Sequence, residues 1–177
     1  MTTIDTLTER NKDFAAHHFV EGLMLMPKLR TMIIGCADPR IDPAHILGIE
    51  IGEALVIRNI GGRITPSALQ SMNMLSRIAQ VEGANPGGGF TIVVLHHTDC
   101  GITRLQGSPD MLADYFGIGK EELPSKAVGD PRAAVAVDVA ALKANPSLPG
   151  DWLVSGLVYD VETGLVDTVV APTPVRG

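Results

Sequence analysis

The chain has 177 residues, of which 45% are apolar, 19% are charged and only 4% are aromatic, and its formal net charge is −6. This length suits a single domain whose core is built mainly from aliphatic side chains. The negative charge and the scattered arginines argue against nucleic acid or an anionic membrane surface as the main partner.

The first ten residues contain no basic segment followed by an apolar stretch, so the sequence predicts no secretory signal. No apolar run approaches the length of a membrane span. We therefore expect a cytoplasmic protein. In a reducing compartment, Cys36 and Cys100 are expected to be metal ligands, catalytic groups or core residues, and not a disulfide.

Helical periodicity and apolar runs alternate along the chain. The expected elements are a helix from the capping-box pair Thr6 and Glu9 to about residue 20, a strand at 32–36, a short helix at 43–48, a strand at 54–59, a helix at 66–83, a strand at 91–97, a helix at 131–144, and strands at 152–160 and 165–170. Three helix starts carry a cap followed by proline: Asp42-Pro43, Thr65-Pro66 and Asp130-Pro131. A glycine-rich connector is expected at 85–89.

The inner strands are continuous apolar runs, which is typical of a parallel sheet buried on both faces. The predicted fold class is therefore α/β, with a mostly parallel central β-sheet flanked by α-helices. Ligands of such sheets bind beyond the carboxyl ends of the strands. Cys36, Asn59 and His97 all lie at such ends.

A metal site is the chemistry that these positions suggest. His97 and Cys100 are three residues apart, so one tight turn could aim both at a single ion, and Cys36 from another strand would add a third ligand. Two thiolates and one imidazole suit zinc, with one coordination position left open. Water in that position would be acidified enough to supply hydroxide near neutral pH. His96 competes with His97, but the spacing to Cys100 favours His97.

Asp38 and Arg40 are candidates for controlling that open position. If Arg40 holds Asp38 in a bidentate pair, the carboxylate could orient the zinc-bound hydroxide. If Arg40 releases it, Asp38 could become the fourth zinc ligand and close the site. Alkaline conditions should favour the open form. Asn59, Gly61 and Gly62 are candidates for the substrate pocket, although a strand cap and a plain tight turn explain them equally well.

Three motifs in this order resemble the β-class carbonic anhydrases, whose relatives hydrolyse carbonyl sulfide or carbon disulfide. They are Cys36-Ala37-Asp38-Pro39-Arg40, Arg58-Asn59-Ile60-Gly61 and His97-Thr98-Asp99-Cys100-Gly101. Each motif alone is a weak signal, and the three together are a strong one. The match runs from about residue 32 to residue 101.

The resemblance implies an enzyme with one Zn²⁺ per chain, bound by Cys36, His97 and Cys100, with Asp38 and Arg40 as a catalytic dyad. The implied reaction is reversible hydration of CO₂ to bicarbonate. The implied assembly is a homodimer or a tetramer made of two dimers, with the site near the interface. A helical arm at 1–30 is expected to lie across the partner chain.

Two departures from the family pattern affect the substrate. Many members have a substrate-binding glutamine shortly before the first cysteine, where this chain has Leu25-Met26-Pro27-Lys28, and the usual serine of the dyad motif is Pro39 here. An apolar wall without the glutamine is compatible with carbonyl sulfide or carbon disulfide as substrate.

Simpler explanations exist for the same residues. Cys36 could be a buried small apolar residue, Asp38 and Arg40 a structural ion pair, and Asp99 a turn or solvent residue. A zinc site closed permanently by Asp38 would be structural and not catalytic. A redox dithiol protein is the third alternative, but its cysteines would need neither His97 nor the dyad, and C-x-x-C spacing is missing.

Overall fold

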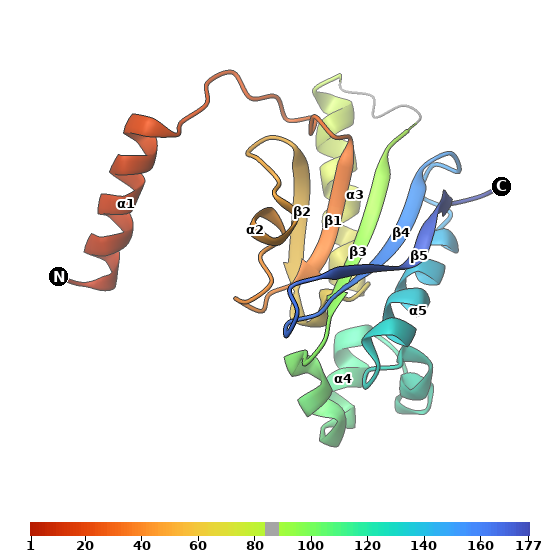
Figure 1. Ribbon diagram of the computed structural model, residues 1–177. Coiled ribbons are helices and arrows are strands. Elements are labelled where there is room, and N and C mark those ends of the chain that lie inside the picture. Colours follow the sequence, from red (N-terminus) through yellow and green to blue (C-terminus); the bar gives the residue numbers. More distant parts are fainter. Residues whose placement is uncertain (84–88) are drawn as a thin grey trace.

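The computed structural model describes residues 1–83 and 89–177, and it contains a five-stranded sheet with the order β2-β1-β3-β4-β5 (Figure 1). The elements are α1 (Thr3–His17), β1 (Thr31–Cys36), α2 (Pro43–Leu47), β2 (Ala54–Asn59), the 3₁₀ turn η1 (Ile60–Gly62), α3 (Pro66–Val81), β3 (Thr91–His97), η2 (Gly101–Gly107), α4 (Pro109–Phe116), η3 (Lys120–Lys126), α5 (Pro131–Lys143), β4 (Leu153–Tyr159) and β5 (Val166–Pro174). Except for Gly89, the expected connector at 85–89 lies outside the described residues.

The sheet is mostly parallel, as predicted. Strands β2, β1, β3 and β4 run in one direction, and only the edge strand β5 is antiparallel to its neighbour. In the register, Cys36 pairs with Asn59 and Gly35 pairs with Leu95. The carboxyl ends of β1, β2 and β3 therefore meet at one edge of the sheet.

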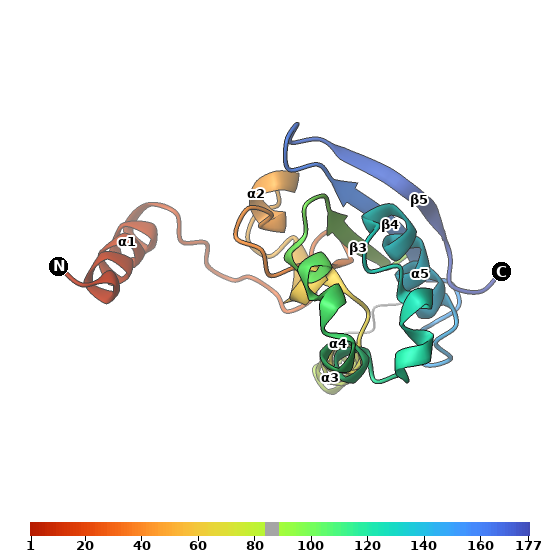
Figure 2. The same cartoon turned by 90° about the horizontal axis from the view of Figure 1, so that it is seen from below.

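The two long helices of the sheet domain cover the same face of the sheet. Gly156 of β4 allows α5 to approach closely, because a Cβ there would lie 3.1 Å from methyl groups of Val135 and Val139. The apolar cluster on this face joins alternate strand residues with side chains of α3 and α5: Met32, Ile34, Met72, Ile92, Val94, Val135, Val139, Leu142, Val154 and Val158. The short helix α2 lies on the opposite face, where Pro43 packs beside Gly35 (Figure 2).

Local signals predicted most element boundaries, and two expectations were wrong in detail. Helix α1 begins at Thr3 and ends at His17, because Thr2 and Asp5 form the capping box and Thr6 lies inside the helix. Strand β5 extends to Pro174, since its pairing with β4 continues to the Leu153–Pro174 pair. No element was expected between 101 and 126, where η2, α4 and η3 form a compact segment.

Helix α1 stands apart from the sheet and its helices in both views (Figures 1 and 2). It has no buried residue, and Ile4 and Leu7 are 66% and 53% exposed. The connection to β1 also carries exposed apolar side chains, including Phe19 and Met24. Within the described chain, no helix combines the length and the apolar character needed to cross a membrane.

Candidate metal centre

The two cysteines and His97 converge at the carboxyl ends of β1 and β3. Cys36 is the last residue of β1, His97 is the last residue of β3, and Cys100 follows in the next turn. One ligand atom from each of the three lies within 4.8 Å of the other two, and all three residues are buried. The parallel register of β1 and β3 brings Cys36 together with Cys100, which is 64 residues further along the chain.

The imidazole of His97 is oriented as a metal ligand would be. Its Nδ1 lies 2.8 Å from the carbonyl oxygen of Thr98. A carbonyl can only accept, so Nδ1 carries the proton and Nε2 presents a lone pair. That Nε2 is buried, and among residues 1–83 and 89–177 it has no hydrogen-bond partner. A buried nitrogen without a partner is costly, and a bound cation would remove that cost.

The distance between the sulfurs also fits zinc. Two zinc–sulfur bonds of about 2.3 Å at a tetrahedral angle of about 109° would place the sulfurs about 3.8 Å apart. The Sγ atoms of Cys36 and Cys100 are 3.8 Å apart. Two cysteines and one histidine are a donor set that catalytic zinc uses, with a further position left for water. The residues present therefore fit a zinc ion.

The two thiols differ in acidity because they are adjacent. A hydrogen bond from Cys100 lowers the pKa of Cys36 well below that of an ordinary thiol, and the backbone N–H groups of Asp38 and Gly61 act in the same direction. Its hydrogen bond with the Cys36 thiolate raises the pKa of Cys100, and burial raises it further. Only a cation between the sulfurs would stabilise both as thiolates.

Asp38 is held beside this centre by Arg40. The guanidinium donates from Nε to Oδ1 at 3.0 Å and from Nη2 to Oδ2 at 2.7 Å. The hydrogen bonds from Arg40 lower the pKa of Asp38 to about 2, so the carboxylate is ionised throughout the neutral range. Its Oδ2 lies 4.0 Å from Nε2 of His97, close to the centre but paired with Arg40.

Asp99 is a second partner of Arg40. Nη1 of Arg40 donates to its Oδ2 at 2.9 Å, and Nη2 donates to its carbonyl oxygen at 3.0 Å. Arg104 donates to the other carboxylate oxygen at 2.9 Å. The turn between His97 and Cys100 gives Asp99 a left-handed φ of +50°, which aims it at Arg40. The interpretation of Asp99 as a turn or solvent residue missed this contact, which no local pattern signals.

Arg58 and Asn59 organise the backbone around the ligands. Arg58 donates to the carbonyl oxygens of Cys36 and Asp38 and to the carboxylate of Asp42, and so ties the loop after β1 to β2. The side-chain amide of Asn59 bonds both the N–H and the carbonyl of Arg63, which closes the turn between them. The amide group of Asn59 is thus engaged inside that turn.

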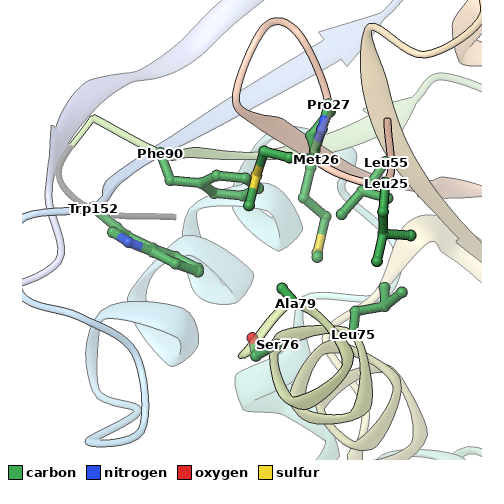
Figure 3. Close-up of a pocket in the computed structure, with 10 residues that line it drawn as sticks. Leu25, Met26, Pro27, Leu55, Leu75, Ser76, Ala79, Phe90 and Trp152 are labelled. Atoms are coloured by element: carbon green, nitrogen blue, oxygen red, sulfur yellow. The ribbon is translucent and has the colours of Figure 1, made fainter. Parts of the chain in front are cut away.

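Two of the cavities among the described residues lie at opposite ends of the sheet. The larger of these two holds about 380 Å³ beside the ligand loop, which is the turn from His97 to Cys100, and its lining also includes Ile102 and Gln106. The smaller holds about 30 Å³ and lies near the amino ends of the strands (Figure 3). Its wall is apolar apart from Ser76.

The segment where many members of the family have a glutamine contributes to the smaller cavity. Leu25, Met26 and Pro27 line it, together with the rings of Phe90 and Trp152, whose centroids are 4.6 Å apart. Strand β1 separates this segment from Cys36 by its full length. Within one chain, therefore, residues 25–27 present only apolar groups and lie away from the metal centre.

Comparison with known proteins identifies the family of the chain. A family model described as carbonic anhydrase matches residues 31–115. The chain is 31% identical to beta-carbonic anhydrase 1 of Mycobacterium tuberculosis over 96% of this chain and 99% of that protein. It is 32% identical to a carbon disulfide hydrolase of Saccharolobus solfataricus over 90% of this chain and 85% of that protein.

Solved structures agree with the sequence relatives. A carbonic anhydrase of Streptococcus mutans superposes with a TM-score of 0.72 at 32% identity, covering 96% of this chain and 98% of that chain. The apo form of a carbon disulfide hydrolase superposes with a TM-score of 0.60 at 26% identity, covering 93% and 88%. With its Cys-His-Cys centre and its five-stranded sheet, the chain belongs to the β-class carbonic anhydrase family, which includes the carbon disulfide hydrolases.

Proposed function

We propose that this chain is a zinc enzyme that hydrates CO₂ reversibly to bicarbonate, with one Zn²⁺ bound by Cys36, His97 and Cys100. The observation that carries the proposal is the preformed set of three ligand atoms with an ionised Asp38 held at its edge by Arg40. A purely structural zinc site would not need the carboxylate of Asp38 to be held beside the ligands by Arg40. A redox dithiol would not need the buried Nε2 of His97.

Each residue has a distinct part in this proposal. Zinc in such a donor set acidifies a coordinated water and so supplies a nucleophile near neutral pH. Asp38 accepts a hydrogen bond from that nucleophile and orients it toward the carbon of the substrate. Arg40 keeps Asp38 from moving onto the metal, and Asp99 holds Arg40 in place.

Carbonyl sulfide or carbon disulfide hydrolysis is the alternative reaction. A beta-carbonic anhydrase and a carbon disulfide hydrolase are similar to this chain at nearly equal identity, 31% and 32%. All three substrates are small linear molecules with an electrophilic carbon, and the cavity beside the ligand loop is large enough for each of them. The missing glutamine is compatible with a sulfur-bearing substrate.

The proposed assembly is a homodimer or a pair of such dimers in which α1 lies on a partner chain. Ile4, Leu7 and Phe14 share one face of α1 because their spacing follows the helical repeat. Exposure of this face in the single chain is consistent with burial against a second copy.

A side-by-side assay distinguishes the reactions. The zinc-loaded protein is expected to hydrate CO₂ with a higher kcat/KM than it shows for sulfide release from carbonyl sulfide or carbon disulfide. A Cys36→Ser variant, matched in size, should lose most of its zinc and its activity because a hard hydroxyl replaces a thiolate. Faster sulfide release would establish the alternative reaction. Activity on none of the three, with one zinc held tightly per chain, would establish a structural site.

An Asp38→Asn variant tests the role of the dyad. Asp38 has a pKa of about 2, so its own titration contributes nothing to the pH profile between pH 6 and pH 9. In this proposal its competition with hydroxide for the metal sets the midpoint of that profile, and its hydrogen bond to the nucleophile sets the maximal rate. Without the carboxylate, the midpoint of the rate profile should move to lower pH, and the maximal rate should fall by roughly 10- to 100-fold.

Stopped-flow rates across that pH range provide the measurement for this variant. Asp114→Asn, on the exposed surface of α4, is the matched control and should leave the profile unchanged. An unchanged midpoint in the Asp38→Asn protein would contradict competition between Asp38 and hydroxide for the metal.

The apolar face of α1 provides a test of the assembly. The double variant Ile4→Asp and Leu7→Asp should reduce the mass in solution from that of a dimer or tetramer toward that of one chain, because two charges would be placed in an apolar contact. Light scattering after size exclusion measures this mass. Ala16→Asp adds a charge at an exposed position on the opposite face of the same helix and should keep the wild-type mass. A wild-type assembly in the double variant would rule out the arm as the contact.

A further inference from the structure

The turn at residues 59–63 delivers a backbone donor to one of the metal ligands. The N–H of Gly61 points to Sγ of Cys36 at 3.2 Å, and the N–H of Asp38 reaches the same sulfur at 3.4 Å. A hydrogen bond to a thiolate withdraws charge from the sulfur and weakens its donation to a bound cation. The 59–63 turn therefore acts on the electronic character of the centre without touching the metal.

The backbone of this turn has little freedom. Gly61 and Gly62 have left-handed φ angles of +79° and +66°. A Cβ on Gly62 would lie 2.9 Å from the carbonyl oxygen of Leu95 and 3.0 Å from the backbone nitrogen of Cys36. Tyr115 donates to the carbonyl oxygen of Ile60 at 2.7 Å from the other side.

The side chain of Arg63 anchors the end of the turn in the protein interior. It is 1% exposed and donates from Nε to Oδ2 of Asp138 at 2.6 Å and from Nη2 to the carbonyl oxygen of Lys126 at 2.7 Å. Its guanidinium carbon lies 4.9 Å above the ring of Phe116. Asp138, on α5, is also 1% exposed. Burying both charges has a large desolvation cost, which the close contacts of Nε and Nη2 offset; Nη1 of Arg63 has no hydrogen-bond partner among the described residues.

The same carboxylate reaches the strand that carries the other ligands. Oδ2 of Asp138 lies 3.2 Å from Nε2 of His96, and that nitrogen also lies 3.2 Å from the carbonyl oxygen of Gly62. His96 directly precedes the ligand His97. Asp138 thus contacts the 59–63 turn through Arg63 and strand β3 through His96, and it joins the two segments behind the metal centre.

We propose that Arg63 and Asp138 are positioning residues of the metal centre, which hold the 59–63 turn so that the N–H of Gly61 bonds Sγ of Cys36 and tunes its donation to the metal. This inference rests on the proposed function only for metal binding by Cys36, and not for the reaction catalysed. Neither side chain touches the metal ligands directly.

The wild-type protein provides the first test. When the protein is loaded with a spin-half isotope of Cd²⁺ and labelled with ¹⁵N, the amide proton of Gly61 should show scalar coupling to cadmium through the sulfur of Cys36. Coupling of cadmium to the β protons of Cys36 without any coupling at the Gly61 amide would overturn the proposal, whatever any variant does.

A double variant provides the second test. Arg63→Met with Asp138→Leu replaces a buried ion pair by apolar side chains of similar size, a change that often preserves folding. Arg132→Met with Asp167→Leu removes the exposed ion pair between α5 and β5 and serves as the matched control. The readouts are the sulfur-to-metal charge-transfer band of the Co²⁺-loaded protein and the dissociation constant of Zn²⁺ in competition with a chelator.

The buried double variant should lose the cadmium coupling at Gly61, shift the charge-transfer band and change the dissociation constant by roughly 10- to 100-fold. The exposed control should match the wild-type protein in all three. A folded double variant with a wild-type band and affinity would overturn the proposal. Should the double variant fail to fold, Arg63→Lys keeps the cation on a single donor nitrogen, which cannot reach both Asp138 and Lys126 as the guanidinium does. It should shift the band to lower energy, as expected when the Cys36 thiolate loses a hydrogen bond; an unshifted band would again overturn the proposal. These readouts involve no substrate, so they separate this proposal from a failure to hydrate CO₂.

Discussion

The parallel register of β1 and β3 is the constraint on which the other features of the site depend. Each strand is held along its length by backbone hydrogen bonds and by the apolar cluster under α3 and α5, so the positions of its last residues cannot vary independently. That rigidity sets the sulfur of Cys36 3.8 Å from the sulfur of Cys100 and places an unpartnered imidazole nitrogen beside them. Three donors fixed in this way have little conformational entropy left to lose when a metal binds.

Arginines connect this rigid edge of the sheet to its loops. Arg40 is shared between Asp38 and Asp99, Arg58 ties the loop after β1 to β2, and Arg63 ties the next turn to α5. The planar, multiply donating guanidinium suits each position, because one side chain must satisfy acceptors on different segments. The guanidinium of Arg40 is about half exposed, whereas the pair at Arg63 is buried.

The features that local sequence determines were predictable. Cap-and-proline signals at Asp42-Pro43, Thr65-Pro66 and Asp130-Pro131 located three helix starts correctly, since a cap acts within one turn of the chain. Continuous apolar runs predicted a mostly parallel sheet. The start of α1 was misplaced because both Thr2 and Thr6 have a carboxylate three residues later, and only the structure shows which pair forms the box.

The contacts missed from the sequence join residues that are distant along the chain. Arg40 and Asp99 are 59 residues apart, and Arg63 and Asp138 are 75 residues apart. Neither pair has a characteristic spacing, and the motifs indicate only their local neighbours. Such contacts follow from the packing of α5 and from the left-handed turn at Asp99, neither of which periodicity or composition encodes.

The central claim is that Cys36, His97 and Cys100 form a preformed zinc site. X-ray absorption at the zinc edge of the metal-loaded protein tests it most directly. Two sulfurs at about 2.3 Å and one histidine nitrogen at about 2.0 Å should surround each zinc, with one lighter donor completing the shell. A shell without sulfur, or zinc that does not bind at one ion per chain, would contradict the account.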